Sequence, residues 1–233
     1  TFVEPRQTLH GDDRVVWVDP KDSRHLIKGD DGGVGISYDR GKKWLYVASL
    51  PVSQFYHVSA STSSPYFVCG GLQDNGSWCG PSQTFSTQGI LNDDWYRVGG
   101  GDGFHNVIDT TDNRTVYSSS QYLGITRVDV QTREAKNLRP TVKEGEGPKL
   151  GNWAAPDPKV GKKIPPAGWN SPFVISSHDP NTVFAGMALL WTSNNRGDTW
   201  RSLGNPTTGV DRRTLRIMGQ PPEENTLSLD DGV

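Results

Sequence analysis

The sequence predicts an all-β fold, a β-propeller built from four-stranded antiparallel blades. Short runs of β-branched and aromatic residues recur at anchor positions Val16, His57, Asn106 and Phe173, which are 41, 49 and 67 residues apart. Turn residues separate these runs, and the 27 glycines and 16 prolines suit many tight turns. The 233 residues therefore hold about four blades, which we expect to be part of a larger ring.

The clearest blade covers residues 14–53, and its first three strands are expected at 14–18, 25–28 and 34–38. An Asp-Pro turn separates the first two strands, and an Asp-Asp-Gly-Gly turn separates the next two. A fourth strand follows Trp44. Three more units of about blade length follow along the chain, and a Pro-, Gly- and Lys-rich insertion separates the last two of them. The divisions are a lead-in at 1–13, blades at 54–103, 104–139 and 172–204, an insertion loop at 140–171, and a tail at 205–233 that begins a further blade.

The turn between the third and fourth strands carries an Asp-box, with the pattern Ser-x-Asp-x-Gly-x-x-Trp. Ser and Asp side chains bond turn amides, Gly adopts the left-handed region, and Trp packs beneath. A second copy has Asn in place of Asp, whose carbonyl can make the same bond. We interpret both as structural turns; their residues are Ser37, Asp39, Gly41 and Trp44, and Ser193, Asn195, Gly197 and Trp200.

Composition excludes some functions. The net charge is −2 with no basic stripe, which argues against nucleic acid as a partner. No apolar run approaches the length of a membrane span. The chain opens at Thr1 rather than Met, so we expect a piece of a longer protein whose remaining blades, or another chain, cover its open edges.

The two cysteines, Cys69 and Cys79, flank a predicted hairpin. If Asn75-Gly76 is a two-residue turn, Cys79 pairs opposite Leu72 and the cysteines lie on opposite faces. That register predicts buried free thiols, whereas a wider loop would allow a disulfide.

Blade topology predicts which loops share a face. Turns between strands two and three lie on the same face as the links between blades, opposite the Asp-boxes. Acidic loops, two histidines and two tryptophans meet on that face, which we call the rim and expect to bind ligand. Its candidate ligand-binding residues are His10, Asp12, Asp13, Gln73, Asp74, Asn75, His105, Trp153, Trp169 and Asn170. Three glycines precede Asp102, and they suggest close approach of backbone to a ligand.

Several segments together resemble a known family: GDDGG at 29–33, GLQDNGSW at 71–78, GGGDGF at 99–104, NWAAPD at 152–157 and WNSPF at 169–173. With the two Asp-boxes, they are similar to secreted bacterial BNR/Asp-box repeat propellers, which are related to sortilin-type propellers and often labelled glycosyl hydrolase. The resemblance implies an extracellular or periplasmic location and specifies no activity.

Two functions fit the rim. The first is a binding or scaffold module that recognises a glycan or an extended peptide. The second is a glycoside hydrolase that uses two carboxyl groups, with Asp102 as the first candidate and Asp30 or Asp31 as its partner. We predict no cofactor, although His10, Asp12 and His105 offer transition-metal ligands and the Asp loops offer oxygen ligands for calcium.

Overall fold

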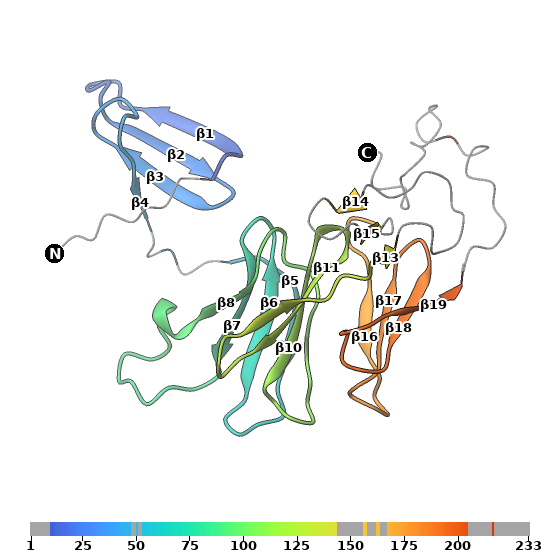
Figure 1. The fold of residues 1–233 in the computed structure, drawn as a ribbon. Coiled ribbons are helices and arrows are strands. Elements are labelled where there is room, and N and C mark those ends of the chain that lie inside the picture. The colour runs from blue at the N-terminus through green and yellow to red at the C-terminus, as the bar shows by residue number, and fades with distance from the viewer. Residues whose placement is uncertain are drawn as a thin grey trace.

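The protein is described by a computed structural model that covers residues 10–47, 50, 53–143, 156–157, 162–163, 167–204 and 216. It confirms the predicted fold class, a partial β-propeller. Four sheets of four antiparallel strands each follow the chain as simple meanders. We number these sheets as blades 1 to 4 in chain order (Figure 1).

The strands of each blade are short. Those of blade 1 are β1 (Asp13–Val18), β2 (Leu26–Asp30), β3 (Gly33–Ser37) and β4 (Leu45–Tyr46). Those of blade 2 are β5 (Phe55–Ala60), β6 (Phe67–Leu72), β7 (Gly76–Pro81) and β8 (Tyr96–Gly99). Those of blade 3 are β9 (Asn106–Ile108), β10 (Thr115–Ser120), β11 (Gly124–Asp129) and β12 (Ala135–Asn137). Those of blade 4 are β16 (Phe173–Ile175), β17 (Val183–Gly186), β18 (Leu190–Ser193) and β19 (Arg201–Gly204).

Two short 3₁₀ helices, η1 (Asn92–Asp94) and η2 (Gln121–Leu123), interrupt the strands. No described helix has the length and apolar character needed to cross a membrane. Within the predicted insertion, β13 (Val142–Lys143), β14 (Pro156–Asp157) and β15 (Lys162–Lys163) form a small separate sheet. The predicted tail lies outside the described residues apart from Arg216.

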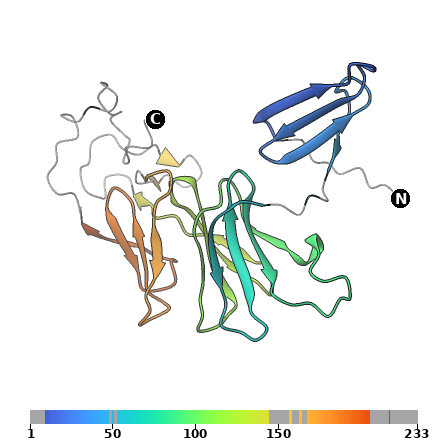
Figure 2. The same cartoon turned by 180° about the vertical axis from the view of Figure 1, so that it is seen from behind.

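Blades 2, 3 and 4 pack side by side (Figures 1 and 2). Apolar residues fill the space between them. One cluster joins Cys69, Cys79 and Val98 of blade 2 to Ile108 and Val116 of blade 3. A larger cluster joins blade 3 to blade 4; among its members are Tyr117, Ile125, Leu138, Phe173, Val183 and Trp191. Burial of these side chains holds the three blades together.

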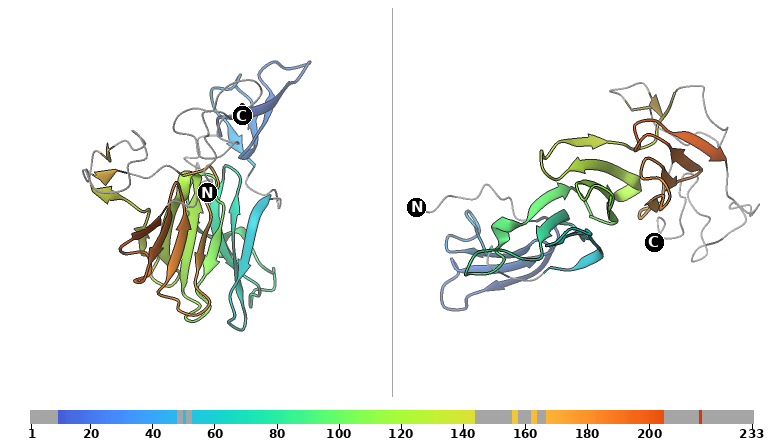
Figure 3. Two further views of the ribbon diagram at one scale, coloured as in Figure 1. Left: turned by 90° about the vertical axis from the view of Figure 1, so that its right-hand side faces the viewer. Right: turned by 90° about the horizontal axis from the view of Figure 1, so that it is seen from below.

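Blade 1 lies apart from this stack (Figure 3). It contributes no residue to either apolar cluster of the described chain, and every residue of β1 is exposed. Its contact with blade 2 is polar: the Asn75 side-chain amide donates a hydrogen bond to the Asp31 carbonyl at 2.9 Å. The β-branched and aromatic residues of β1 suit a buried strand, but the described part of the chain leaves them exposed.

The Ser-x-Asp-x-Gly turn of blade 1 contains the side-chain bonds that its sequence predicts. The Gly41 amide donates to Ser37 Oγ at 2.9 Å, and the Lys43 amide donates to Asp39 Oδ1 at 2.9 Å. Blade 4 repeats both bonds, because the Gly197 amide donates to Ser193 Oγ at 2.8 Å and the Thr199 amide donates to Asn195 Oδ1 at 2.9 Å. An Asn carbonyl thus replaces the Asp carboxylate in the second copy.

The predicted register of the β6–β7 hairpin is wrong. The turn spans the three residues 73–75, with Asp74 in the left-handed region at φ 60°, so Leu72 pairs with Gly76. Cys69 then lies directly opposite Cys79, and the two form a disulfide with an S–S distance of 2.00 Å. The prediction of free thiols failed because it placed the turn at Asn75-Gly76, whereas Gly76 already belongs to β7.

Candidate ligand-binding rim

One end of the stack gathers the turns that join second to third strands. These turns are residues 31–32, 73–75, 121–123 and 187–189, and the blade links at 100–105 and 167–172 lie with them. The hydrogen bond between Asn75 and Asp31, and another from the Tyr122 amide to the Trp169 carbonyl at 3.1 Å, tie neighbouring turns and links together. These bonds connect the turns of blades 1 and 2, and they connect the turn of blade 3 to the link that precedes blade 4.

Asp102 lies at the centre of these contacts and is only 6% exposed. Its Oδ1 accepts a hydrogen bond from the Asp74 amide at 2.6 Å, and its Oδ2 accepts one from Gln121 Nε2 at 2.9 Å. The carboxylate thus joins turns of blades 2 and 3. Because both oxygens are occupied and little of the residue is exposed, Asp102 acts as a brace and is a poor candidate for a catalytic acid.

The glycines beside Asp102 allow close packing of protein on protein. Gly101 has φ 67°, and a Cβ there would lie 2.3 Å from the Gln121 side-chain oxygen. A Cβ on Gly103 would lie 2.2 Å from the Gly76 carbonyl oxygen. The backbone approach inferred from these glycines exists, but it is toward the neighbouring turns rather than toward an open ligand site.

Asp74 is the most perturbed carboxyl group of the rim. Burial raises its pKa, and the neighbouring carboxylates of Asp102 and Asp31 raise it further, to about 6. Asp31 behaves oppositely, since Arg14 binds it through two bonds of 2.7 and 2.6 Å and lowers its pKa. Asp31 is thus an ion-pair partner, and Asp74 is left as the carboxyl group whose protonation changes near neutral pH.

Asp30 and Asp13 are also engaged within blade 1. Asp30 Oδ1 accepts a hydrogen bond from the Gly32 amide at 2.9 Å, and its fully buried side chain lies 3.3 Å from Lys28 Nζ. Lys28 also pairs with Asp13. These contacts give Asp30 and Asp13 structural roles in the turn, and they leave Asp30 unavailable as a catalytic partner of Asp102.

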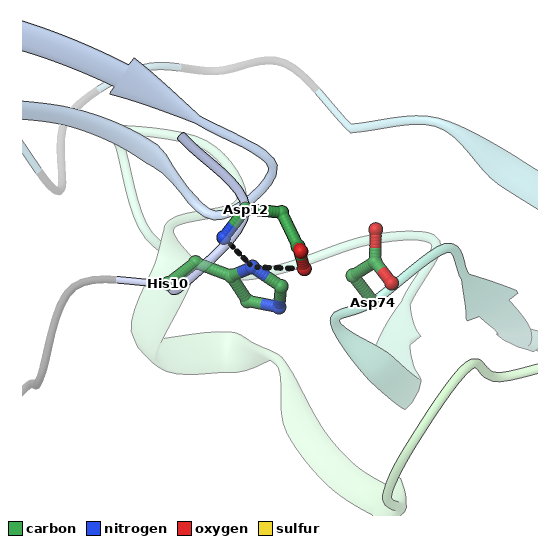
Figure 4. A group of neighbouring side chains, drawn as sticks. All are labelled: His10, Asp12 and Asp74. Carbon is green, nitrogen blue, oxygen red and sulfur yellow. Dashed lines mark hydrogen bonds and ion pairs between the residues drawn. The ribbon is translucent and has the colours of Figure 1, made fainter. Parts of the chain in front are cut away.

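His10 and Asp12 meet Asp74 across the gap between blades 1 and 2 (Figure 4). One potential ligand atom from each of the three lies within 4.8 Å of the others. His10 Nδ1 is already paired with Asp12 Oδ2 at 3.2 Å and is also close to the Asp12 amide. The contacts between His10 and Asp12 account for the position of these two groups, and no metal is needed to explain them. The predicted third ligand, His105, lies elsewhere.

His105 packs between blades instead of lining an open loop. Its ring stacks on His57 with centroids 4.1 Å apart and meets Phe173 edge-on at 6.4 Å. Burial lowers the pKa of His105, with His57 contributing, so the ring is held neutral. Of the other predicted rim residues, Gln73 and Asn170 are exposed and Trp153 lies outside the described residues.

An aromatic surface lies beside Asp102. Trp169 and Tyr122 meet edge to face with centroids 5.3 Å apart, and they are 40% and 43% exposed. Phe104, which is buried, supports Trp169 at 6.4 Å and Tyr56 at 5.3 Å. Burial raises the pKa of the Tyr56 hydroxyl, and Asp102 and Asp74 raise it further, so this hydroxyl lies near both carboxyl groups. Three partly exposed rings therefore adjoin the acidic groups.

Three of these residues were missed from the sequence: Tyr56, Gln121 and Tyr122. The topological rule that identified the rim also places the β10–β11 turn there, so it could have found Gln121 and Tyr122. Tyr56 lies within β5, and no turn signal marks it. A hollow of about 200 Å³ lies in the β18–β19 hairpin of blade 4, lined by residues 192–195 and 199–201. It has no titratable group except Arg201, so we place the site on the rim.

Comparison with protein-family models and with curated proteins finds no match. Among solved structures, the chain is similar to an auxiliary nutrient binding protein from Bacteroides thetaiotaomicron VPI-5482, with 13% identity over 87% of this chain and 44% of that chain and a TM-score of 0.43. It is also similar to an ancestral GH74 enzyme, with 14% identity, coverage of 83% and 26%, and a TM-score of 0.38. A third similar structure is the extracellular domain of a hybrid two-component system from B. thetaiotaomicron, with 12% identity, coverage of 87% and 26%, and a TM-score of 0.38.

The chain spans less than half the length of each of these three proteins. At this level of identity and superposition, the matches specify neither a ligand nor an activity for this chain. The functional assignment therefore depends on the rim.

Proposed function

We propose that this chain is part of an extracellular binding propeller that holds an oligosaccharide on its rim. The observation that carries the proposal is the exposed pair Tyr122 and Trp169, adjoining the carboxylate-rich turns through Gln121, which hydrogen-bonds Asp102. Sugar rings have an apolar face that packs on aromatic rings, and their hydroxyls bond carboxylate and amide groups. The rim offers both kinds of group together.

The negative charge of the rim decides which class of glycan can bind there. Asp12, Asp31, Asp74 and Asp102 concentrate negative charge near the aromatic surface, and Arg14 is paired with Asp31. An anionic sugar placed there would be repelled by these like charges. The preferred ligand is therefore a neutral or amino sugar. An extended peptide is the competing ligand class, and the binding test below separates the two.

Glycoside hydrolysis is the second candidate, because Asp74 has the raised pKa that a general acid needs. The three aspartates that the sequence suggested as catalytic are occupied: Asp102 braces two turns, Asp31 is paired with Arg14, and Asp30 is buried beside Lys28. We expect no release of reducing sugar by this chain. Release that is abolished by Asp74→Asn, with binding retained, would establish the enzyme instead.

The disulfide is consistent with an oxidising compartment, since cytosolic thiols are kept reduced. Together with the two Ser-x-Asp/Asn-x-Gly turns, it supports the assignment to secreted BNR/Asp-box propellers that the sequence resemblance implies. Mass spectrometry of this protein from its native source, with and without reduction, would test the location through the redox state of Cys69 and Cys79.

Calorimetric titration with cellohexaose, mannohexaose, chitohexaose and a mixed-sequence peptide would test the function. We expect at least one oligosaccharide to bind and the peptide not to bind. Trp169→Ala and Tyr122→Ala should each raise Kd by about tenfold, the equivalent of about 1.4 kcal/mol of lost ring contact. Trp17→Ala is the control, because Trp17 is an exposed aromatic residue of blade 1. Equal loss in all three variants, or binding of the peptide alone, would contradict the proposal.

A further inference from the structure

The interfaces that join blades 2, 3 and 4 contain apolar contacts between consecutive blades. On the face of blade 3 that meets blade 4, Tyr117 of β10 pairs with Val107 of β9. Phe173, the first residue of β16, packs on Tyr117 with ring centroids 6.4 Å apart. The first strand of blade 4 thus covers an apolar face of the blade before it.

A turn adds a second contact at each of these interfaces. Arg196, in the β18–β19 turn, reaches back to blade 3 and forms a charged clamp with Asp109 and Asp112. Arg133, in the β11–β12 turn, reaches back to blade 2, where its guanidinium carbon lies 3.2 Å from the ring centroid of Tyr96. In both cases, the segment between the third and fourth strands contacts the preceding blade.

Blade 1 has an apolar face toward the following blade, and this face is exposed. Ser37 takes the place of Ser193 in the matching turn, and Ser193 pairs with Val183, which packs against blade 3. The side of blade 1 that carries Ser37 is therefore its side toward a preceding blade, and the opposite side is the one that should meet blade 2. Apolar residues occupy paired positions on that opposite side: Val15, Trp17, Ile27, Val34, Ile36 and Leu45. Val15, Trp17 and Leu45 are exposed.

Blade 2 exposes an apolar surface that fits this face. Val58 pairs with Gly70, next to Cys69, so its side chain lies on the side of blade 2 opposite the disulfide that packs toward blade 3. Phe55 lies over the same glycine, since a Cβ on Gly70 would be 2.4 Å from its ring. Both Val58 and Phe55 are exposed. The first strand of blade 2 thus presents apolar side chains toward the side of blade 1.

The segment between β7 and β8 is the blade 2 equivalent of the turns that carry Arg133 and Arg196. It covers residues 82–95 and includes η1. Three of its apolar residues are exposed: Phe85, Ile90 and Leu91. An exposed apolar segment at this position is suited to contact with the preceding blade, which is blade 1.

We propose that blade 1 packs on blade 2 in a closed form of this protein, in equilibrium with the open form of Figure 1. In the closed form, Phe55 packs on Trp17 and Ile27, the pair that stands where Phe173 meets Val107 and Tyr117. Leu45 stands where Lys136 meets Asp198 of the β18–β19 turn, so the 82–95 segment covers Leu45.

The contact between the two blades at the rim serves as the pivot of this closure. Asn75 binds the Asp31 carbonyl there in the open form. Both residues lie in turns between second and third strands, so blade 1 can swing about this end while the other end of the blade approaches blade 2.

Blade 1 is the partner that chain connectivity favours for this surface of blade 2. The link between β4 and β5 covers 47–54, and it is no shorter than the link 100–105, which joins blade 2 to the packed blade 3. Elements that follow one another along a chain are usually neighbours in the fold. A short covalent link also gives blade 1 a high effective concentration at the exposed face of blade 2.

Double electron–electron resonance between two spin labels would detect the closed form. Lys21 and Gln88 are exposed, in the first turn of blade 1 and in the 82–95 segment, and closure brings them together. The full chain labelled at Lys21→Cys and Gln88→Cys should give two distances, the shorter from the closed form. A control pair, Gln131→Cys and Asn194→Cys, spans the packed blades 3 and 4 and should give a single distance.

Two substitutions in β1 identify the face that closes. Val15→Asp would bury a carboxylate among apolar side chains, so it should lower the ratio of closed to open form by about tenfold. Val16→Asp is the matched control, because Val16 points to the other side of β1 and has similar exposure, 55% against 61% for Val15. It should leave the ratio unchanged.

The outcomes separate a closed form from a permanently open one. A single short distance that Val15→Asp lengthens would support the same packing of blade 1 on blade 2. A single long distance in the chain without the aspartate substitutions would overturn the proposal. Equal loss of the short distance with Val15→Asp and Val16→Asp, in chains that circular dichroism shows to be folded, would overturn it as well.

Discussion

Replacing Asp74 with Asn should stabilise the protein at alkaline pH. Asp74 lies beside the carboxyl groups of Asp102 and Asp31, and its pKa is raised from 3.8 to about 6. Because the folded state holds the proton more tightly than the unfolded state, stability falls as pH rises from about 4 to about 6. Asn keeps the side-chain shape and tolerates the φ of 60° at this position.

The magnitude follows from the shift in pKa. A shift of about two units corresponds to about 3 kcal/mol, and partial exposure and solvent screening reduce it to about 1.5 kcal/mol. Asp74→Asn should therefore increase the free energy of unfolding by about 1.5 kcal/mol at pH 8 and leave it unchanged at pH 4. Urea unfolding followed by tryptophan fluorescence at five pH values between 4 and 8 would measure this.

Asp129→Asn is the matched control for Asp74→Asn, because the pKa of Asp129 is shifted in the opposite direction. Arg114 lowers the pKa of Asp129 to about 2, so its charge stabilises the folded state above pH 4 and that contribution is lost as pH falls toward 2. Asp129→Asn should destabilise at pH 8, where Asp74→Asn stabilises. If Asp74→Asn destabilises at pH 8, or has the same effect at pH 4 and pH 8, the account of the acidic rim is wrong.

Three further predictions concern the stability of blade 2 and of the contact between blades 3 and 4. Reduction of the Cys69–Cys79 disulfide, which closes a short loop of sequence separation 10, should lower the free energy of unfolding by about 2–3 kcal/mol, measured by urea unfolding with and without reductant. Arg196→Ala should cost about 2–4 kcal/mol, because it leaves the buried Asp109 carboxylate without its cation; an effect below 0.5 kcal/mol would refute the clamp. Trp200→Phe should cost about 1 kcal/mol through loss of the bond to Leu138, and unchanged thermal unfolding would argue against that bond.

The fold was predictable because blades are locally encoded. The Asp-Pro turns, the Ser-x-Asp/Asn-x-Gly turns and the alternating strands each specify structure within a few residues, and the four meanders follow from them. The cysteine pair was mispredicted because register depends on which residues form the turn: Asp74 and Gly76 both have positive φ, but Gly76 already pairs with Leu72, so the turn covers 73–75 rather than Asn75-Gly76 alone.

The site was only partly predictable. Topology placed Asp74 and Trp169 on one face, but the exposure and pairing of each group depend on contacts between blades that no local pattern encodes. Asp102 illustrates this, because its glycines suggested a ligand whereas Asp74 and Gln121 supply its partners. Tyr56 was missed for a similar reason, since only the approach of Phe104 and two carboxyl groups to β5 brings it into the rim.

The most direct test of the binding rim is hydrogen–deuterium exchange of the full chain, with and without the oligosaccharide that binds most tightly from the set above. The account predicts slower exchange in residues 73–75, 100–105, 121–123 and 167–172, and unchanged exchange in the Ser-x-Asp/Asn-x-Gly turns at 37–44 and 193–200. Protection confined to the turns at 37–44 and 193–200, or no protection by any of the oligosaccharides, would contradict it.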